Sequence, residues 1–506
     1  MSTPYSPDKN GKAISTYAPS FAKDLMQEYT AWQSDSENIS LGIATSTSVG
    51  KAIIDKIVTG VVGQGLTPMA SPYANVLGWT KEQADIFQRD AETFWNIFTG
   101  TRFYDWYGKN SFKQIQQQAL RNCLIYGDFL NHRGYRKLGS TVVPFVQTIG
   151  GNMVCNRDFV DQKTNRGGVL YKKGSDIEYG YEVVVIGDNL EDTYDTKKVM
   201  RYNSEGFMEF DLVVLGQLTE KTTRGIPLFN PVRGDILMLE KIKNNYLVKM
   251  SVQNVLALYL KQSENPQDTG ISTAEKLMGL QQSPKQPEVR GKVDLGPGVI
   301  IEGKPGEEAQ LLQAATQSAD FAQLFRTILE NISAACWGLP VEVLLSSFNA
   351  SFSASRASIN IAEKCFSEKR TEFIQKFMAP AWEQVVDYGI RIGFIQAPGY
   401  TFGKNIFIDK QILASTWTGV TPVQIDPVKE VNAFETAINL GICTREYAIR
   451  NLYGLDADEV FERIAQEQAK MEQLGISPTT TPIEQTDKID KTDDTDEKEE
   501  DTDEEK

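Results

Sequence analysis

Residues 296–380 decide the fold of this chain. The segment opens on the string Gly296-Pro-Gly-Val-Ile-Ile-Glu-Gly-Lys-Pro-Gly-Glu307, which reads as a strand marked by glycine and proline, and continues into an apolar helix. It then passes through the loop Ser346-Ser-Phe-Asn-Ala-Ser-Phe-Ser-Ala-Ser-Arg356 into a second long helix. A small, polar loop between two long helical patterns is typical of a flexible finger held over a scaffold. Nothing in the segment indicates catalysis.

Length and charge describe a globular body with one acidic end. A chain of 506 residues exceeds what one hydrophobic core usually supports, so two or more packed regions are expected. Residues 482–506 contain thirteen Asp/Glu and four Lys, a net of -9, which leaves -6 of the total -15 for the rest. Such a segment cannot bury enough apolar surface to fold, so we expect it to stay solvated. A role in keeping the protein soluble is favoured over a role as a binding site.

The five cysteines indicate a reducing compartment. They are odd in number and widely spaced, which argues against a disulfide framework and a zinc site: Cys123, Cys155, Cys336, Cys365 and Cys443. The N-terminus lacks an apolar targeting segment, and no apolar run approaches the roughly 18 residues that a membrane helix needs. We therefore expect the protein to be cytosolic where it is made and to have no membrane-spanning helix.

Apolar spacing divides the first half into helices and then strands. The 3.6-residue period predicts a helix that begins near Ser46 and stops at Gly63-Gln-Gly65, and further helices at residues 82–98 and 111–126, with Ser111 as a cap. Short β-branched and aromatic runs follow, and they predict strands: residues 142–146, 168–171, 181–186 and 212–215.

The second half is dominated by long helices. Helical spacing covers residues 236–261, and a polar stretch at residues 262–297 reads as a small projecting module. A cleaner helix follows, with Ser318 as a possible cap, and Gly338-Leu-Pro340 ends it. Pro380 should bend the long helix beyond the loop, and a final helical group begins near Asp426-Pro427.

A search for chemistry finds no catalytic, metal or cofactor site. The single histidine, His132, excludes most metal clusters and imidazole-based triads, and a structural role is favoured for it. No phosphate-cradling string occurs, and Gly63-Gln-Gly65 reads as a helix stop. The carboxylates of Asp456-Ala-Asp-Glu459 complement a helix dipole, and a metal site there is the less favoured reading. The nearest thing to a basic patch, Lys285, Arg290 and Lys292, is sparse.

Several separate strings resemble the lambda-type family of portal proteins of tailed bacteriophages. The first is Arg224-Gly-Ile-Pro227 ahead of a long helix, and the second is the Pro-Gly strand that ends at Lys304-Pro-Gly-Glu307. Gly338-Leu-Pro340 with its loop and Ser-Arg-Ala357 is also similar, as are Trp417-Thr-Gly, Asp426-Pro-Val-Lys-Glu430 and Gly441-Ile-Cys-Thr444. The family's arginine-rich N-terminal stretch is replaced here by Ser36-Glu-Asn-Ile-Ser-Leu, and no aspartate stands just before Asn349.

The resemblance implies an α+β portal fold with a strand-rich wing, two long stem helices, a small clip, a channel loop, a kinked long helix and a helical crown. It implies this order of segments: an N-terminal arm (residues 1–45), the wing (46–235), stem helix 1 (236–261), the clip (262–310), stem helix 2 (317–337), the channel loop (343–353), a kinked helix and wing return (354–425), the crown (426–480) and a disordered acidic tail (481–506).

The resemblance also implies a function without enzyme activity or cofactors. A ring of usually twelve copies would stand at one capsid vertex of the virion, after assembly in the host cytoplasm. Double-stranded DNA would pass through it without sequence specificity, driven by the large terminase subunit, and head-tail adaptor proteins and the major capsid or scaffold protein would attach to it. The channel loop would comprise Ser346, Ser347, Phe348, Asn349, Ser351, Phe352 and Ser353. The clip contact with terminase or adaptor would comprise Lys285, Arg290 and Lys292.

Two other functions remain open from the residues alone. One is a soluble hydrolase that uses only carboxylates such as Asp105 and Asp128, which would require paired carboxylates in a deep pocket. The other is a capsid scaffold or adaptor protein without a channel. Like a portal protein, it would have no catalytic residues.

Overall fold

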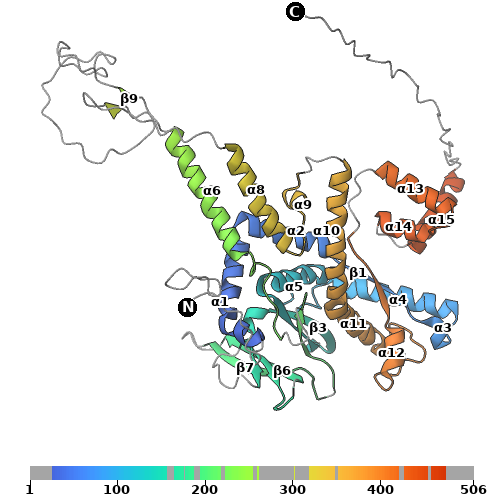
Figure 1. Cartoon of the computed structure of the whole chain (residues 1–506). Coiled ribbons are helices and arrows are strands. Elements are labelled where there is room, and N and C mark those ends of the chain that lie inside the picture. Colours follow the sequence, from blue (N-terminus) through green and yellow to red (C-terminus); the bar gives the residue numbers. More distant parts are fainter. Residues whose placement is uncertain are drawn as a thin grey trace, which may run out of the picture. The chain divides into compact units, whose positions relative to one another are not determined.

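A computed structural model describes residues 25–155, 164–175, 177–186, 194–204, 206–217, 223–254, 259–260, 301–302, 318–347, 352–420, 427–453 and 457–474. The chain forms two compact units, Met1–Ile425 and Asp426–Lys506 (Figure 1). The first unit mixes helices and strands, and the described part of the second is helical. The expected α+β class is confirmed.

Five helices form the N-terminal part of the described chain, and three of them begin at side-chain caps. The five are α1 (Leu25–Ser46), α2 (Ser48–Val61), the short α3 (Ala74–Leu77), α4 (Lys81–Gly100) and α5 (Phe112–Tyr126). Thr47 caps α2, and Thr80 and Ser111 each form a capping box with a glutamine three residues later. The predicted helices of this region and the cap at Ser111 are confirmed. Gly63 and Gly65, both at positive φ, follow α2, as the helix-stop reading requires.

Helix α1 was not predicted. The N-terminal arm expected at residues 1–45 is helical over its described part, and α1 packs against α2, α5 and α6. Its inward side chains from residue 33 to residue 40 are polar, which is why apolar spacing did not find it.

The strand prediction is confirmed as two antiparallel sheets. One has the order β3-β2-β8, with β2 (Asp128–Leu138) paired to β3 (Thr141–Gly150) on one side and to β8 (Phe210–Val214) on the other. The other has the order β4-β5-β6-β7 and comprises β4 (Asn165–Arg166), β5 (Val169–Tyr171), β6 (Glu178–Ile186) and β7 (Tyr194–Met200). The turn η1 (Gly151–Met153) follows β3. A small core, formed by residues such as Leu130, Val154 and Tyr181, joins the two sheets.

Two long helices, α6 (Arg233–Asn254) and α8 (Ser318–Ala335), lie side by side (Figure 1). The rings of Tyr246 and Phe321 stack between them with centroids 3.9 Å apart. Ser318 is the first residue of α8, so it does not cap that helix. Gly338, at positive φ, and Pro340 stand in the turn after α8, as predicted.

The first of these helices is shorter than predicted. We expected helix over residues 236–261, but α6 ends at Asn254, and β9 (Tyr259–Leu260) is a strand that pairs in parallel with β10 (Ile301–Glu302). The apolar spacing continues past the helix end because strand residues in this stretch are apolar too. Almost all of the expected clip, residues 262–310, lies outside the described residues.

The long helix after the loop contains a π-helical turn. It consists of α10 (Phe352–Phe373), the π-helical η2 (Ile374–Met378) and α11 (Ala379–Arg391), and the short α9 (Val341–Leu345) precedes it. Pro380 lies in the first turn of α11, where its missing N–H costs no regular α-helical bond. The bend predicted at Pro380 stays a prediction, and the structure shows a wide π-helical turn just before the proline.

The main core of the first unit lies between the helices and β2. Trp382 on α11 is fully buried, and its Nε1 donates to the Leu413 carbonyl at 3.0 Å. That contact joins α11 to the segment that holds α12 (Ile406–Ile412) and β11 (Ser415–Thr418). Strand β11 pairs with β1 (Thr67–Ala70), so the chain returns to its own N-terminal half.

The second unit contains α13 (Pro427–Asn439), α14 (Arg445–Tyr453) and α15 (Ala457–Leu474). Pro427 opens α13, as predicted, whereas Asp426 and the acidic tail lie outside the described residues. Across all described ranges, no helix combines the length and apolarity that crossing a bilayer would need.

Candidate functional site

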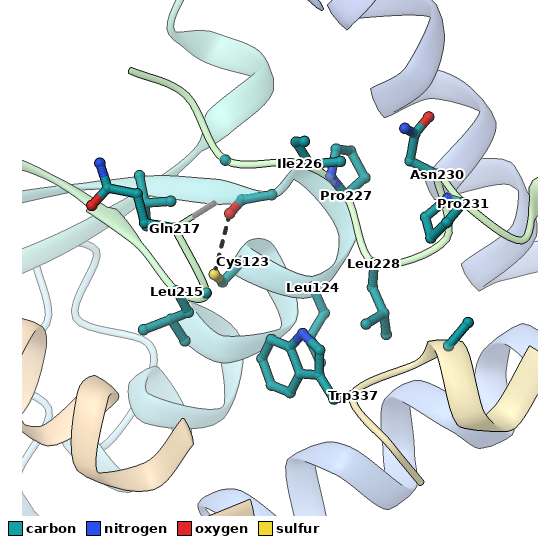
Figure 2. Close-up of a pocket in the computed structure, with 15 residues that line it drawn as sticks. Cys123, Leu124, Leu215, Gln217, Ile226, Pro227, Leu228, Asn230, Pro231 and Trp337 are labelled. Atoms are coloured by element: carbon teal, nitrogen blue, oxygen red, sulfur yellow. Dashed lines mark hydrogen bonds between the residues drawn. The ribbon is translucent and has the colours of Figure 1, made fainter. Parts of the chain in front are cut away.

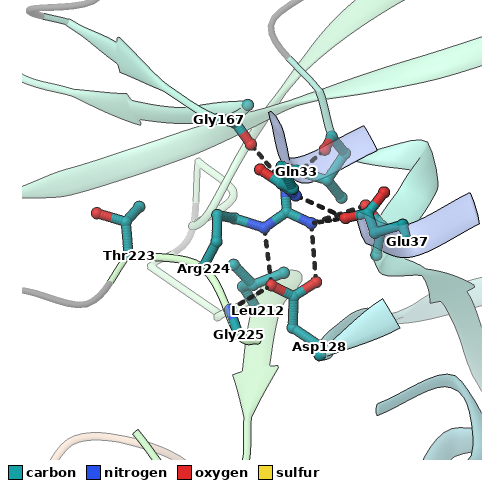
Figure 3. Close-up of polar contacts among 12 residues, drawn as sticks. Gln33, Glu37, Asp128, Gly167, Leu212, Thr223, Arg224 and Gly225 are labelled. Carbon is teal, nitrogen blue, oxygen red and sulfur yellow. Dashed lines mark hydrogen bonds and ion pairs between the residues drawn. The ribbon is translucent and has the colours of Figure 1, made fainter. Parts of the chain in front are cut away.

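The guanidinium of Arg224 joins three segments of the first unit. Arg224 has no exposed surface, and its Nε and Nη2 donate to the two carboxylate oxygens of Asp128 at 2.7 and 2.9 Å (Figure 3). Nη1 donates to the carbonyls of Val154 and Gly167, both at 2.6 Å, and Nη2 to the carbonyl of Gly151 at 2.8 Å. Asp128 is the first residue of β2, Gly151 begins η1 and Val154 follows it, and Gly167 lies in the turn after β4. One planar donor thus fixes both sheets to each other.

The glycine after Arg224 allows a close backbone approach. The N–H of Gly225 donates to Asp128 Oδ2 at 2.8 Å. A Cβ on Gly225 would lie 2.0 Å from the carbonyl oxygen of Gly127, and Gly127 itself has φ +91°. Neither position has room for a side chain, which is the physical reason for Arg-Gly in the Arg224-Gly-Ile-Pro227 string. The string is structural and leads from the sheets to the start of α6.

Helix α1 adds a second carboxylate to this site. Glu37 Oε1 lies 3.5 Å from Arg224 Nη2 and accepts a hydrogen bond from Gln33 Nε2 at 2.7 Å. Burial raises the pKa of Glu37 to about 7, against the opposing effect of Arg224. The site therefore holds one arginine and two carboxylates in a region almost without solvent.

A cavity of about 310 Å³ lies beside the string, between α5 and the end of α8 (Figure 2). Its walls are mostly apolar and include Leu215, Ile226, Leu228 and Trp337, and none of the described residues that line it is Asp or Glu. Burial raises the pKa of Cys123, which also lines it, to about 12, so the thiol stays protonated. The described residues around the cavity offer no group for proton transfer or nucleophilic attack.

The start of the predicted channel loop is fixed to α2. Ser346 ends α9 at φ +52°, and its Oγ accepts a hydrogen bond from Lys56 Nζ at 2.7 Å. Ser346 and Ser347 are both exposed. The loop is shorter than the predicted residues 343–353, because residues 343–345 belong to α9 and residues 352–353 to α10. Of the other predicted loop residues, Phe348, Asn349 and Ser351 lie outside the described residues, as do the side chains of Phe352 and Ser353.

The predicted clip contacts Lys285, Arg290 and Lys292 also lie outside the described residues, so the structure does not place them. His132 is described, and it has structural partners. Its Nδ1 lies 3.0 Å from Gln147 Oε1, its Nε2 lies 3.3 Å from Glu209 Oε1, and its ring stacks on Phe210 with centroids 4.1 Å apart.

The two carboxylates considered for a hydrolase are both engaged in backbone or ion-pair contacts. Asp105 accepts hydrogen bonds from the N–H groups of Tyr107, Lys109 and Asn110 at 2.8–3.2 Å, and Asp128 pairs with Arg224. Within the described ranges no group of three or more His, Cys, Asp or Glu could hold a metal ion. The geometry supports structural roles for both aspartates.

Sequence reasoning missed Glu37 and the pairing of Arg224 with Asp128. The Arg-Gly-Ile-Pro string was recognised, but its partner lies 96 residues earlier and Glu37 lies on an unpredicted helix. A single buried arginine in a sequence carries no signal that distinguishes it from an exposed one.

Comparison with known proteins gives the family. The sequence matches "Phage portal protein, lambda family" over residues 43–370, from the end of α1 into α10. Similar chains occur in two solved structures, "Virion of native gene transfer agent (GTA) particle" and "Neck of native GTA particle computed with C12 symmetry". The first is 10% identical with a TM-score of 0.42 and covers 83% of this chain and 93% of that chain. The second is 10% identical with a TM-score of 0.39 and covers 82% of this chain and 93% of that chain. No curated protein matches.

The family match over residues 43–370 identifies a structural protein of the portal class. The chain belongs to the lambda family of phage portal proteins, since the match covers more than half of its residues. This family is a non-enzymatic component of phage heads.

Proposed function

We propose that this chain is the repeating subunit of a ring at one vertex of a phage-type capsid. The ring forms in the host cytoplasm, becomes part of the virion, and is the conduit for DNA during packaging and later ejection. The observation that carries the proposal is the family match over residues 43–370, which includes the wing strands, both long helices and the link between α9 and α10.

Exposed apolar side chains on α6 support a repeating assembly. Ile236 and Leu239 are buried in the subunit core, but Leu237, Met238 and Val248 are 54–62% exposed. A helix that is apolar on several faces is normally covered on all of them. Copies of the same chain arranged around an axis, twelve in the form that the family resemblance implies, would cover the remaining faces.

The composition of the link between α9 and α10 supports a conduit for DNA. Residues 346–353, which comprise this link and the first two residues of α10, contain serine, asparagine, alanine and phenylalanine and no charged residue. Each lysine or arginine contact with a phosphate strengthens binding and would slow the movement of the duplex. An uncharged loop at the lumen lets double-stranded DNA slide without sequence-specific contacts.

The same proposal assigns partners to the remaining segments. The clip, with Lys285, Arg290 and Lys292, would face the large terminase subunit during packaging and head-tail adaptor proteins afterwards. The major capsid or scaffold protein would contact the outer part of the ring.

Deletion of residues 346–353 is expected to leave ring assembly intact and to reduce packaged or retained DNA severalfold. The link is short and exposed at Ser346 and Ser347, so its removal leaves the core contacts of α8 and α10 in place. Negative-stain images of the purified variant check assembly, and the DNA content of assembled particles checks function.

A variant in which residues 346–353 are replaced by glycine and serine at equal length is the matched control. It separates the need for a loop of this length from the need for Phe348, Asn349 and Phe352. Wild-type amounts of retained DNA in the deletion variant would contradict the assignment of this loop to the channel.

A further inference from the structure

Helix α1 enters the apolar core at Ile43 and Ala44, but the preceding part of its inward face is polar. Gln33, Ser36, Glu37 and Ser40 form one inward stripe, and each is less than 8% exposed. Ser36 Oγ donates to Asn230 Oδ1 at 2.9 Å, in the segment just before α6. Glu37 is 5% exposed and faces Arg224, which makes it the only one of the four that can carry a charge into the interface.

The charges at this interface do not balance when Arg224, Asp128 and Glu37 are all ionised. Arg224 supplies one positive charge, and Asp128 already neutralises it through two hydrogen bonds. An ionised Glu37 would add a second negative charge to a site whose three side chains are 0–6% exposed. A buried charge without its own counter-ion is strongly unfavourable, whereas a neutral carboxylic acid is not.

Other titratable groups near Glu37 do not remove the imbalance. On α5, burial and then the nearby Glu37 raise the pKa of Tyr126, so this phenol stays uncharged and does not neutralise the acid. On β4, Arg166 places its guanidinium over the ring of Tyr171, 4.7 Å from the centroid. Within α1 itself, the neighbour of Glu37 is the neutral amide of Gln33.

We propose that α1 docks on the wing with Glu37 as a neutral carboxylic acid, so that docking takes up one proton from solvent and a rise in pH loosens the N-terminal helix. The proton resides on the Glu37 carboxyl group, and the ion pair of Arg224 with Asp128 stays intact throughout. This linkage is independent of ring formation.

The direction and the pH range follow from the two states of Glu37. Burial raises its pKa in the docked state to about 7, from 4.5 in a solvated chain. Docking is then most favourable below pH 4.5, weakens as the pH rises from 4.5 to 7, and stays constant above that. Within the range the equilibrium for undocking changes up to about tenfold per pH unit.

Hydrogen–deuterium exchange of the full chain tests the proposal. Protection of residues 33–46, corrected for the intrinsic pH dependence of exchange, should fall severalfold between pH 5 and pH 7 in the wild type. It should be nearly constant in E37Q, which keeps a neutral side chain of the same shape. D35N, which alters an exposed carboxylate on the same helix, should behave like the wild type. Equal pH dependence in wild type and E37Q would overturn the proposal.

A measurement on the wild type alone covers the case in which E37Q does not fold. Nuclear magnetic resonance of chains labelled with ¹³C at the glutamate carboxyl should show one resonance that titrates near pH 7. Titration of every glutamate resonance below pH 5.5 would equally overturn the proposal.

Discussion

Replacement of Arg224 by methionine is expected to lower the free energy of unfolding of the first unit by about 3–5 kcal/mol. The variant leaves Asp128 buried without its ion-pair partner, the carbonyls of Val154 and Gly167 lose the guanidinium donor, and the Gly151 carbonyl keeps only the N–H of Val154. Uncompensated buried carboxylates and carbonyls are the costly part of such a change, because methionine fills a similar volume. Urea denaturation of the purified chain, followed by tryptophan fluorescence, measures the loss.

Arg89 provides the matched control for this prediction. Its side chain is 72% exposed and forms a surface ion pair with Asp90 at 3.3 Å. R89M should therefore change the free energy of unfolding by no more than about 0.5 kcal/mol. A loss below about 1 kcal/mol in R224M would show that Arg224 does not lock the two sheets together.

The second large effect is expected at Trp382, where W382A should cost about 3–5 kcal/mol. The side chain is fully buried, its ring centroid lies 5.5 Å from that of Trp95, and its Nε1 holds the Leu413 carbonyl. Truncation leaves a large cavity and an unpartnered carbonyl at the point where β11 returns to β1. The same denaturation experiment measures the loss, and near-ultraviolet circular dichroism reports loosening of the aromatic cluster.

Phe407 serves as the control for an aromatic truncation. It lies on α12, close in sequence to Leu413, but 83% of its surface is exposed. F407A should leave the free energy of unfolding within about 0.5 kcal/mol of the wild type. If W382A and F407A had equal effects, the core position assigned to α11 would be wrong.

The elements that could be predicted from the sequence are those whose burial is apolar and local. Helices α4, α5 and α8 bury residues at a 3.6-residue period, and the caps of α4 and α5 stand next to their first turns. Strands β3, β5, β6 and β8 were also recognisable, because β-branched and aromatic runs alternate with glycine-containing turns.

The elements that were missed depend on polar or distant contacts. Helix α1 turns Gln33, Ser36, Glu37 and Ser40 inward, and polar side chains at helical spacing resemble a solvated segment until Arg224 is placed against them. The end of α6 was misjudged because Tyr259 pairs with Ile301, about forty residues later, and no local pattern contains that pairing. The identity of the family was accessible, since short strings such as Arg224-Gly-Ile-Pro227 identify it before their physical role is known.

The same division applies to the site. The loop between α9 and α10 was predicted because two helices frame it, although both helices extend further into it than expected. The lock formed by Arg224, Asp128 and Glu37 could not be predicted, because its members lie on three segments separated by about 90 residues each. Residues so far apart in the sequence come into contact only when the sheets have formed.

The central claim is that copies of this chain close into a ring around a channel, and electron microscopy of the purified full-length protein at micromolar concentration tests it most directly. The expected result is closed rings of one subunit number with a central opening wide enough for a DNA duplex, roughly 20 Å or more across given the dimensions of B-DNA. Particles that remain single subunits at every concentration, or that assemble without a central opening, would contradict it.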